Sequence, residues 1–460
     1  MKPPVFALVG HPNKGKSSLA ATLARDDSVR IGPEPGTTTF AREYPLRVAN
    51  QVLYVLVDTP GFQRARAALA WMREHETHAA DRPAVVARFV REKSDDPHFR
   101  DEWELLRPVV DGAGIIYVVD GATPYGPEYE AEMEILRWTG KPSLAVINPI
   151  GEPRFVEPWR RALEQFFRIV RVVDVHQAPF AQQVELLQAF GQMSESWVPA
   201  INQAVAALSS HRQQQAEDAA RVIAELLADA LTHRETRALA KDADPAPYRE
   251  GLEQAYRRHL RQLERRARRE VEALYNFDEL DREEVDMAPL ETDLLSQESW
   301  LAFGLEKRDL VVAGAATGAV AGGVIDVALL GASFLTGALV GSAVGGAAVY
   351  FASDKLADLK VLHQPMGGTR AVYGPTRNVQ FPFVLLSRAL HHHRLVAART
   401  HAQRGKLSLE NEAPGFPDDD TRRWAKLFQR LRKTEAGTGA RASAVVDLTD
   451  AIAALTRTAG

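Results

Sequence analysis

The chain contains 460 residues, of which 45% are hydrophobic and 25% are charged, and its formal net charge is −4. This length predicts two or three domains of a globular protein, and the slightly negative charge argues against a dedicated nucleic-acid binder. The sequence has no cysteine. Disulfides, thiolate metal sites and cysteine nucleophiles are therefore excluded, which fits a reducing compartment.

A phosphate-binding loop follows the first predicted strand, residues 5–9. Residues 10–17 read G-H-P-N-K-G-K-S, the complete G-x-x-x-x-G-K-S pattern. Glycines let the backbone wrap around an anion, and the amides of the helix that follows attract phosphate. Lys16 is placed to reach the β- and γ-phosphates, and Ser17 offers its hydroxyl to Mg²⁺. The residues expected to bind the nucleotide here are Asn13, Lys14, Gly15, Lys16, Ser17 and Ser18.

Two further motifs suit a nucleotide switch. The apolar strand predicted at 52–57 ends in Asp58-Thr59-Pro60-Gly61. Asp58 is expected to hold Mg²⁺ through water, and the Gly61 amide is expected to contact the γ-phosphate and so to sense hydrolysis. The stretch 35–39 reads P-G-T-T-T. It is either an ordinary polar loop or a switch segment that brings a threonine hydroxyl to Mg²⁺.

Strands and helices alternate over residues 1–180, which predicts a mostly parallel α/β sheet. A charged insertion at 62–111 interrupts this alternation after the D-x-x-G motif. Its pattern is helical around 65–76, 84–93 and 102–110. The insertion is either a transmitter of nucleotide state, because it is attached directly to the second switch motif, or a surface elaboration.

These motifs resemble those of the Era/TrmE/EngA group of translation-factor-type GTPases. The resemblance rests on G-x-P-N-x-G-K-S at 10–17, P-G-T-T at 35–38 and D-T-P-G at 58–61, and it covers about the first 180 residues. It implies a P-loop GTPase fold, in which helices flank the sheet. It also implies GTP or GDP and Mg²⁺ as ligands and, in some members of the group, K⁺.

The resemblance assigns roles to individual residues. Thr38 matches the switch I threonine, and Asn13 matches the loop asparagine that helps some members to hold K⁺. Phe62 stands where Ras-type enzymes carry a glutamine that orients the attacking water, so turnover is expected to be slow and to depend on a cation, a dimer partner or another side chain. The expected catalytic residues are Lys16, Thr38 and Gly61, and the expected Mg²⁺ ligands are Ser17, Thr38 and Asp58.

The motif that selects guanine in this group is incomplete. After the strand predicted at 143–147 the group has N-K-x-D, and this chain has Asn148-Pro149-Ile150-Gly151. Asn148 is retained as a nucleotide-binding residue. Gly151 replaces the carboxylate that would pair with guanine, and that pairing is what discriminates against adenine. Glu152 is a candidate substitute.

The pattern changes to long helices over residues 181–300, predicted as a helical or coiled-coil region. The helix predicted around 252–274 carries seven arginines beside its apolar stripe. Its charged face is either a surface for anionic lipid or a partner, or a solvated face with interspersed glutamates, which we favour.

A hydrophobic segment, residues 310–353, lies in the predicted C-terminal domain, residues 301–460. It is rich in alanine and glycine, with Asp326 as its single charged residue. Glycines repeat every four residues, so two helices could approach closely, and Asp326 is expected at a turn. Three interpretations remain: a hairpin that enters a membrane, a hairpin buried inside the protein, and a glycine-zipper pore.

Two features follow the hydrophobic segment. Residues 378–386 fit an N-x-x-F-P-x-V-L-L stretch. With the alanine- and glycine-rich segment, this stretch resembles an uncharacterised bacterial family that joins an Era-like GTPase domain to a C-terminal domain of unknown function. The three consecutive histidines at 391–393 fan out around a helix and cannot chelate one metal well, so a solvated helix end is predicted.

The sequence thus predicts a GTP-binding protein with slow, Mg²⁺-dependent hydrolysis. Its switches would control contact with a membrane or a protein partner through the mainly α-helical C-terminal domain, with its Ala/Gly-rich hydrophobic hairpin. The alternative is a nucleotide-binding scaffold with relaxed base specificity and little hydrolysis. We expect a cytoplasmic protein, peripheral or integral at the inner membrane. The sequence does not decide whether the chain forms a homodimer, and no nucleic-acid partner is expected.

Overall fold

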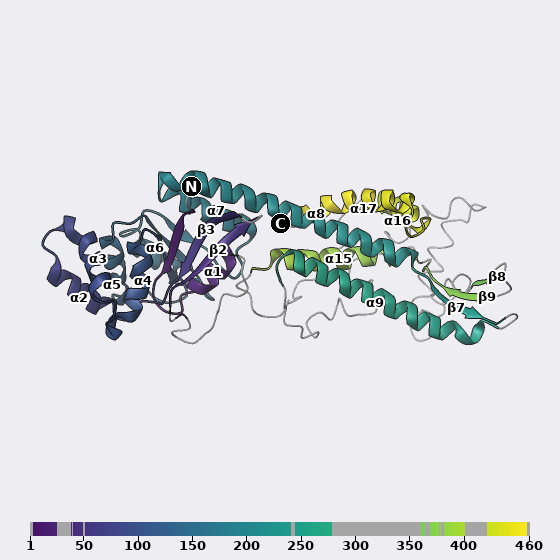
Figure 1. Cartoon of the computed structure of the whole chain (residues 1–460), viewed down its shortest axis with the longest axis horizontal. Coiled ribbons are helices and arrows are strands. Elements are labelled where there is room, and N and C mark those ends of the chain that lie inside the picture. Colours follow the sequence, from purple (N-terminus) through teal and green to yellow (C-terminus); the bar gives the residue numbers. More distant parts are fainter. Residues whose placement is uncertain are drawn as a thin grey trace. The chain divides into compact units, whose positions relative to one another are not determined.

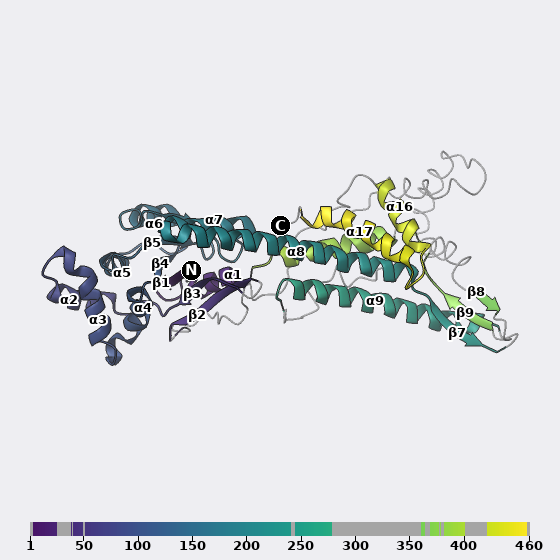
Figure 2. The ribbon, with the colours of Figure 1, turned by 45° about the horizontal axis from the view of Figure 1, so that its top comes forward.

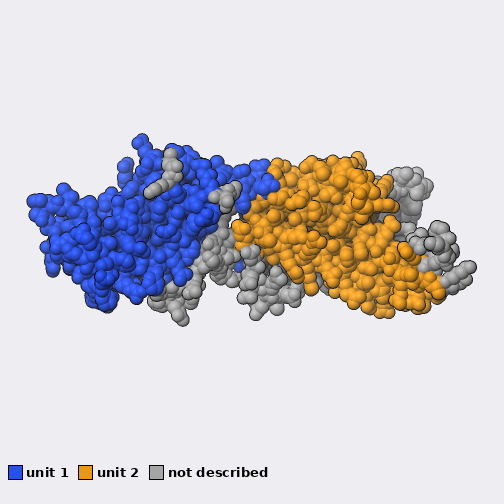
Figure 3. Space-filling view, viewed as in Figure 1, with its two compact units in different colours: residues 1–214, 398–405 blue, residues 215–397, 406–460 orange. Residues whose placement is uncertain are grey.

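The computed structural model of the chain divides into two compact units (Figure 3). Unit 1 comprises residues 1–214 and 398–405, and unit 2 comprises residues 215–397 and 406–460. The structure describes residues 3–24, 38, 40–48, 51–240, 244–277, 360–363, 369–376, 378, 381–400 and 421–457. The predicted hydrophobic hairpin within 310–353 lies outside the described residues.

Unit 1 is built on a six-stranded sheet with strand order β2-β3-β1-β4-β5-β6 (Figure 1). Its strands are β1 (Val5–Val9), β2 (Arg42–Val48), β3 (Gln51–Asp58), β4 (Gly114–Asp120), β5 (Ser143–Asn148) and β6 (Val170–Val172). Only the β2–β3 pair is antiparallel in this sheet. The apolar runs of β1, β3, β4 and β5 suit parallel strands buried on both faces.

Helices cover both faces of this sheet. They are α1 (Lys16–Ala24), α2 (Ala65–His75), α3 (Arg82–Glu92), α4 (Arg100–Val110), α5 (Glu128–Trp138), α6 (Val156–Leu163), α7 (Phe180–Gln192) and α8 (Val198–Thr232). Ala7 and Val9 of β1 pack in one apolar cluster with α2–α6. The alternate residues Phe6 and Leu8 pack in a second cluster with α1, α7 and the start of α8. The predicted α/β fold is confirmed.

The insertion after the D-x-x-G motif folds as the three predicted helices, α2, α3 and α4, which lie together at one end of unit 1 (Figures 1 and 2). Two short 3-10 turns separate them, η1 (Ala79–Asp81) and η2 (Pro97–Phe99). Pro83 lies in the first turn of α3, where its missing N–H costs little. The Asp96 side chain accepts the His98 N–H at the start of η2.

Unit 1 extends well past the last strand of its sheet. Phe190 of α7 packs against Phe6 of β1 with ring centroids 4.8 Å apart, and Trp197 of the 3-10 turn η3 (Glu195–Trp197) lies 5.1 Å from the same ring. Ile201 and Leu208 of α8 belong to the same cluster. The helices after residue 180 therefore complete one face of the sheet.

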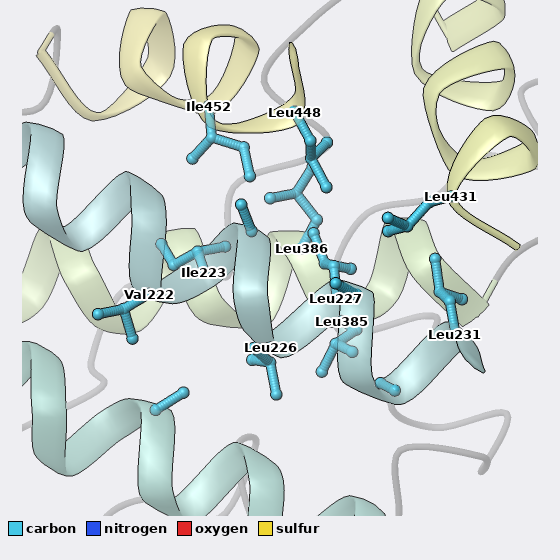
Figure 4. Packing of buried hydrophobic residues seen from close by; sticks show 14 of the residues in the cluster. Val222, Ile223, Leu226, Leu227, Leu231, Leu385, Leu386, Leu431, Leu448 and Ile452 are labelled. Atoms are coloured by element: carbon cyan, nitrogen blue, oxygen red, sulfur yellow. The ribbon is translucent and has the colours of Figure 1, made fainter. Parts of the chain in front are cut away.

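Unit 2 is mainly helical and also contains a small sheet. Its further elements are β7 (Glu235–Leu239), η4 (Ala246–Tyr248), α9 (Arg249–Leu274), β8 (Lys360–His363), β9 (Thr369–Tyr373), α15 (Phe381–Ala398), α16 (Thr421–Arg432) and α17 (Gly439–Arg457). The strands form an antiparallel sheet in the order β7-β9-β8, which the sequence did not predict. Side chains of α8, α15, α16 and α17 meet in the apolar core of this unit (Figure 4).

Buried ionic groups tie α9 to α15. Arg388 is 1% exposed and donates two hydrogen bonds to Glu264, from Nε at 2.8 Å and from Nη2 at 3.2 Å. Arg268 donates to the same carboxylate at 2.7 Å. The exposed face of α9 carries further arginine–glutamate pairs one turn apart, such as Arg266–Glu270. That this face is solvated stays a prediction.

The predicted solvation of residues 391–393 is wrong. All three histidines are buried in α15. His392 pairs with Glu272 at 3.1 Å, and His393 is hydrogen-bonded to the Tyr275 hydroxyl at 2.8 Å. These partners come from α9 and the residue after it, and their hydrogen bonds to two of the rings offset part of the cost of burial. Among the residues that the structure describes, no helix combines the length and apolar character needed to cross a membrane.

Candidate functional site

The loop between β1 and α1 has the backbone shape that its glycines predict. Gly10 and Gly15 adopt φ values of +138° and +87°, and Asn13 has a φ of +59°. A Cβ at Gly10 would lie 2.5 Å from the Val118 carbonyl oxygen, and one at Gly15 would lie 2.2 Å from Nδ2 of Asn148. Neither position can accept a side chain, because space and φ both forbid it.

Lys16 is the first residue of α1, and its side chain is 6% exposed. Its ammonium donates to the carbonyl oxygens of His11 at 2.9 Å and Gly10 at 3.4 Å, so it spans the loop. Burial lowers the pKa of Lys16, and the nearby charge of Asp58 opposes that shift. A buried cation matched mainly by carbonyl dipoles is suited to an anionic ligand.

The three predicted Mg²⁺ ligands meet at one point. Ser17 donates to Oδ2 of Asp58 at 2.7 Å, Thr38 donates to the same oxygen at 3.1 Å, and the two hydroxyl oxygens are 3.2 Å apart. The other oxygen of Asp58, Oδ1, is buried and has no hydrogen-bond partner within the described part of the chain. Burial raises the pKa of Asp58, against the hydrogen bond from Ser17 and the charge of Lys16. Such a set of hard oxygens, with one left unmatched, fits Mg²⁺.

The D-x-x-G segment packs directly on the phosphate loop. A Cβ at Gly61 would lie 2.4 Å from the Pro12 nitrogen, so this position also requires glycine. The Phe62 N–H donates to the Gly10 carbonyl oxygen at 3.1 Å. The Phe62 side chain is 1% exposed and belongs to the core beneath the sheet, so it has no polar group to offer a water molecule.

Asn148 braces the phosphate loop from the end of β5. Its Nδ2 donates to the Lys14 carbonyl oxygen at 3.4 Å, and its Oδ1 accepts the Val175 N–H at 3.2 Å. Lys14 itself donates to the Thr123 hydroxyl at 3.0 Å. Ser18 is buried in the first turn of α1. These contacts hold the loop in shape, and nucleotide binding by Asn148, Lys14 and Ser18 stays a prediction.

The guanine-selecting position is open. Gly151 adopts a φ of +104°, and a Cβ built there meets no atom within 4 Å among the described residues. Ile150 is 41% exposed. The suggested substitute, Glu152, is an exposed residue whose carboxylate pairs with Arg154. No carboxylate in the described part of this segment takes the place of the missing one.

Sequence reasoning missed several buried glutamates in unit 1. Glu132 of α5 is 2% exposed, lies 2.8 Å from Nδ1 of His11 and accepts the Tyr117 hydroxyl at 2.9 Å. Burial raises its pKa, although the hydrogen bond from His11 opposes the shift. Glu102 and Glu104 of α4 are also buried. The available signal was a glutamate within an apolar helical stripe, which periodicity alone treats as a polar interruption.

The fold and this loop define unit 1 as a nucleotide-binding domain of the P-loop GTPase class. A family model described as "50S ribosome-binding GTPase" matches residues 5–149. A second, described as "Domain of unknown function (DUF3482)", matches residues 160–450. Because the second match covers more than half of the chain, the chain belongs to the DUF3482 family, here joined to an N-terminal GTPase domain of the Era and Der kind. Both predicted resemblances are confirmed.

The curated relatives are similar to part of this chain. GTPase Der of Paraburkholderia phymatum is 31% identical over 145 residues, which are 32% of this chain and 26% of that protein. GTPase Der of Vibrio cholerae serotype O1 is 26% identical over 198 residues, 40% of this chain and 34% of that protein. The chain thus spans between a quarter and about a third of the length of these relatives.

Two solved structures of Era are similar at 18% identity and a TM-score of 0.31. One is Aquifex aeolicus Era bound to GDP·AlF4⁻, and the other is Era in complex with MgGDPNP and a segment of 16S ribosomal RNA. Each match covers 60% of this chain and 90% of the Era chain.

Proposed function

We propose that unit 1 binds GTP with Mg²⁺ and hydrolyses the nucleotide slowly. The observation that carries this proposal is the meeting of the Ser17 and Thr38 hydroxyls at Asp58, whose Oδ1 is left unmatched among the described residues. These three residues would hold the metal. Bound there, Mg²⁺ would neutralise charge on the phosphate oxygens.

Phosphate binding and the orientation of the attacking water depend on side chains and amides of the chain itself. Lys16 supplies a buried positive charge, and the amides at the start of α1 point at the same place, so phosphate is favoured over water. Gly61 packs against Pro12 of the loop, and its amide would meet the γ-phosphate. Because Phe62 is buried and apolar, no side chain at that position orients a water molecule, and slow turnover follows.

A hydrolysis assay tests the enzyme proposal. Phosphate release from GTP is measured with Mg²⁺ in K⁺ and in Na⁺ buffers, with Lys16→Ala as the background control. We expect turnover above that background, faster in K⁺ if Asn13 helps to hold this ion. Turnover equal to the Lys16→Ala background in both salts would favour the alternative, a nucleotide-loaded scaffold.

The choice of base depends on the segment that follows β5. The names of the relatives support GTP, whereas the open position at Gly151 favours relaxed selection, because a pocket without the carboxylate does not penalise adenine. Competition of GTP and ATP for a fluorescent guanine nucleotide separates the two. Gly151→Asp, which restores the carboxylate, is expected to increase preference for GTP, although the positive φ of this position limits the gain.

We further propose that nucleotide state controls a contact of the helical unit with a membrane or a protein partner, in the cytoplasm or at the inner membrane. The support is the family architecture, a GTPase domain joined to a helical unit, and the predicted hydrophobic segment 310–353. Co-flotation with liposomes is measured with GDP, with a non-hydrolysable GTP analogue and without nucleotide. Protein that stays off the liposomes in all three states contradicts the membrane proposal.

RNA binding is the competing outcome, because one Era structure contains ribosomal RNA. The net charge of −4 leads us to expect no RNA partner. Filter binding with ribosomal RNA at low and physiological salt tests this expectation, and light scattering with each nucleotide tests whether a homodimer forms.

A further inference from the structure

Helix α4 of the insertion contacts two backbone segments near the proposed Mg²⁺ ligands. One segment follows Gly61, and the other follows Thr38. Glu102 is 0% exposed, and its Oε1 accepts the backbone N–H groups of Gln63 at 2.9 Å and Arg64 at 2.5 Å. These residues directly follow Phe62 and precede α2. Glu104 is 6% exposed, and its Oε2 accepts the Ala41 N–H at 3.0 Å, three residues after Thr38.

The first contact replaces a missing helix cap. The N-cap residue of α2, Arg64, makes no side-chain capping bond of its own, and the first amides of a helix need acceptors. Glu102 supplies a carboxylate from another helix, where both its charge and its hydrogen bonds favour the positive end of α2. Removing Glu102 would leave the N–H of the N-cap residue, Arg64, and the N–H of Gln63 before it without this acceptor.

The two carboxylates leave α4 in opposite directions. Residues two positions apart on a helix are separated by about 200° around its axis. Helix α4 therefore lies between the segment after Gly61 and the segment after Thr38. Oε2 of Glu102 is buried and has no hydrogen-bond partner among the described residues. One acceptor therefore remains for an N–H or a water molecule when the segment beside it rearranges.

We propose that Glu102 and Glu104 are positioning residues of the GTPase reaction: α4 fixes the backbone beside Gly61 and Thr38 in the geometry that hydrolysis requires. This inference rests on the proposed function. Because both contacts come from the N-terminal half of one helix, α4 moves with both switch segments when the nucleotide changes. The insertion is then the element that reads nucleotide state, which selects between its two predicted roles.

The test separates positioning from folding. Glu102→Ala is expected to lower kcat for GTP about ten- to hundred-fold with little change in KM, since displacement of a positioned group by about 1 Å can cost that much. Glu102→Gln keeps an oxygen acceptor and is expected to lie between Glu102→Ala and the unmodified protein. Glu104→Gln, which weakens one bond, is expected to have a smaller effect. Asp101→Asn on the same turn is the matched control and should leave kcat unchanged.

Hydrogen exchange gives a second measurement on the unmodified protein. The amides of Ala41, Gln63 and Arg64 are expected to exchange more slowly with a non-hydrolysable GTP analogue than with GDP, together with those of α4. Unchanged kcat in both Glu102 variants, or nucleotide-dependent exchange elsewhere that spares these amides, overturns the inference. If the unmodified protein does not hydrolyse GTP above the Lys16→Ala background, the proposed function fails instead.

A different observation, in unit 2, points to a metal site. His233 follows α8, Glu235 begins β7 and His259 lies in α9. One ligand atom of each lies within 4.8 Å of the others. His233 Nε2 is 2.9 Å from the Glu235 carboxylate, and the two histidine rings stack with centroids 3.6 Å apart. The Tyr256 ring lies on His233 at 5.7 Å, which limits its rotation.

We propose that His233, Glu235 and His259 bind a divalent transition-metal ion such as Zn²⁺. Two imidazoles and a carboxylate suit such ions, and the residue after α8, the start of β7 and helix α9 bring these groups together.

Titration calorimetry of the full chain with Zn²⁺, after treatment with a chelator, tests this site. Co²⁺ absorption in the visible range reports the coordination. His259→Gln and Glu235→Gln are expected to weaken binding at least ten-fold, whereas His75→Gln in unit 1 should not. Binding that is absent from the unmodified protein, or unchanged in the two unit 2 variants, overturns the proposal.

Discussion

Units 1 and 2 both bury charged side chains, but they match these charges differently. In unit 1, burial raises the pKa of Asp58 and lowers that of Lys16, so both charged forms are disfavoured. In unit 2, burial acts on Glu264 as well, but the charges of Arg268 and Arg388 outweigh it, and the pKa of Glu264 falls below its ordinary value. A buried charge that the fold leaves partly unmatched marks a place for a ligand, whereas a fully matched one marks structure.

The largest effect is expected from a substitution that breaks the buried ionic group of Glu264, Arg268 and Arg388. Arg388→Met leaves Glu264 with a single cationic partner, and breaking a buried pair costs about 3–5 kcal/mol of the free energy of unfolding. Urea denaturation followed by circular dichroism measures this loss, with the exposed Arg422→Met on α16 as control. A loss below about 1 kcal/mol, the value of a surface pair, would show that the group is not structurally important.

Asp58→Asn is expected to act in the opposite direction on stability. A carboxyl whose folded pKa is raised favours the folded state at low pH, and this contribution is lost as the pH rises through the folded pKa. At neutral pH, replacing Asp58 by a neutral amide should therefore raise the melting temperature of the nucleotide-free protein, while the Mg²⁺ dependence of nucleotide binding disappears. Asp111→Asn, at an exposed position, should change neither property, and a lower melting temperature for Asp58→Asn contradicts the comparison.

The pH dependence of nucleotide binding tests whether Asp58 and Lys16 are the partly matched charges that bind the ligand. A proton competes with Mg²⁺ for Asp58, so the apparent Mg²⁺ affinity should fall as the pH decreases, starting above the ordinary aspartate pKa of 3.8. On the alkaline side, Lys16 should lose its charge, and with it phosphate affinity, below the ordinary lysine pKa of 10.5. Fluorescent-nucleotide titrations across pH measure both limbs. An acid limb that persists in Asp58→Asn would assign that limb to another group.

The smallest effect is expected on the exposed face of α9. The Arg266 side chain is 76% exposed, although it pairs with Glu270 at 2.7 Å, and solvent screens such pairs. Arg266→Ala should leave the melting temperature and nucleotide affinity unchanged within error. A clear loss of stability would mean that surface ion pairs stabilise unit 2 as strongly as its buried ionic group does.

The sequence predicted the phosphate site better than its surroundings. Lys16, Ser17 and Asp58 belong to motifs in which chemistry fixes both residue type and spacing, and the structure brings them together with Thr38. Glu102 escaped prediction because the amides that it accepts are 38 and 39 residues earlier in the chain, and no local pattern encodes such a contact.

In unit 2, too, contacts between residues far apart in the chain could not be predicted from local patterns. The histidines at 391–393 are polar in any hydropathy pattern, yet Glu272 and Tyr275, more than a hundred residues earlier, provide partners that allow their burial. The sheet β7-β9-β8 was missed because its strands are only four or five residues long, and two of them pair across a gap of more than a hundred residues along the chain.

The extension of unit 1 past its sheet has a practical consequence for dissecting the protein. A fragment that stops at residue 180, where sequence motifs of the GTPase domain end, would remove Phe190 and Trp197 from Phe6 and expose the hydrophobic face of β1 to solvent. We expect such a fragment to aggregate during expression. A recombinant GTPase domain should instead continue through residue 214.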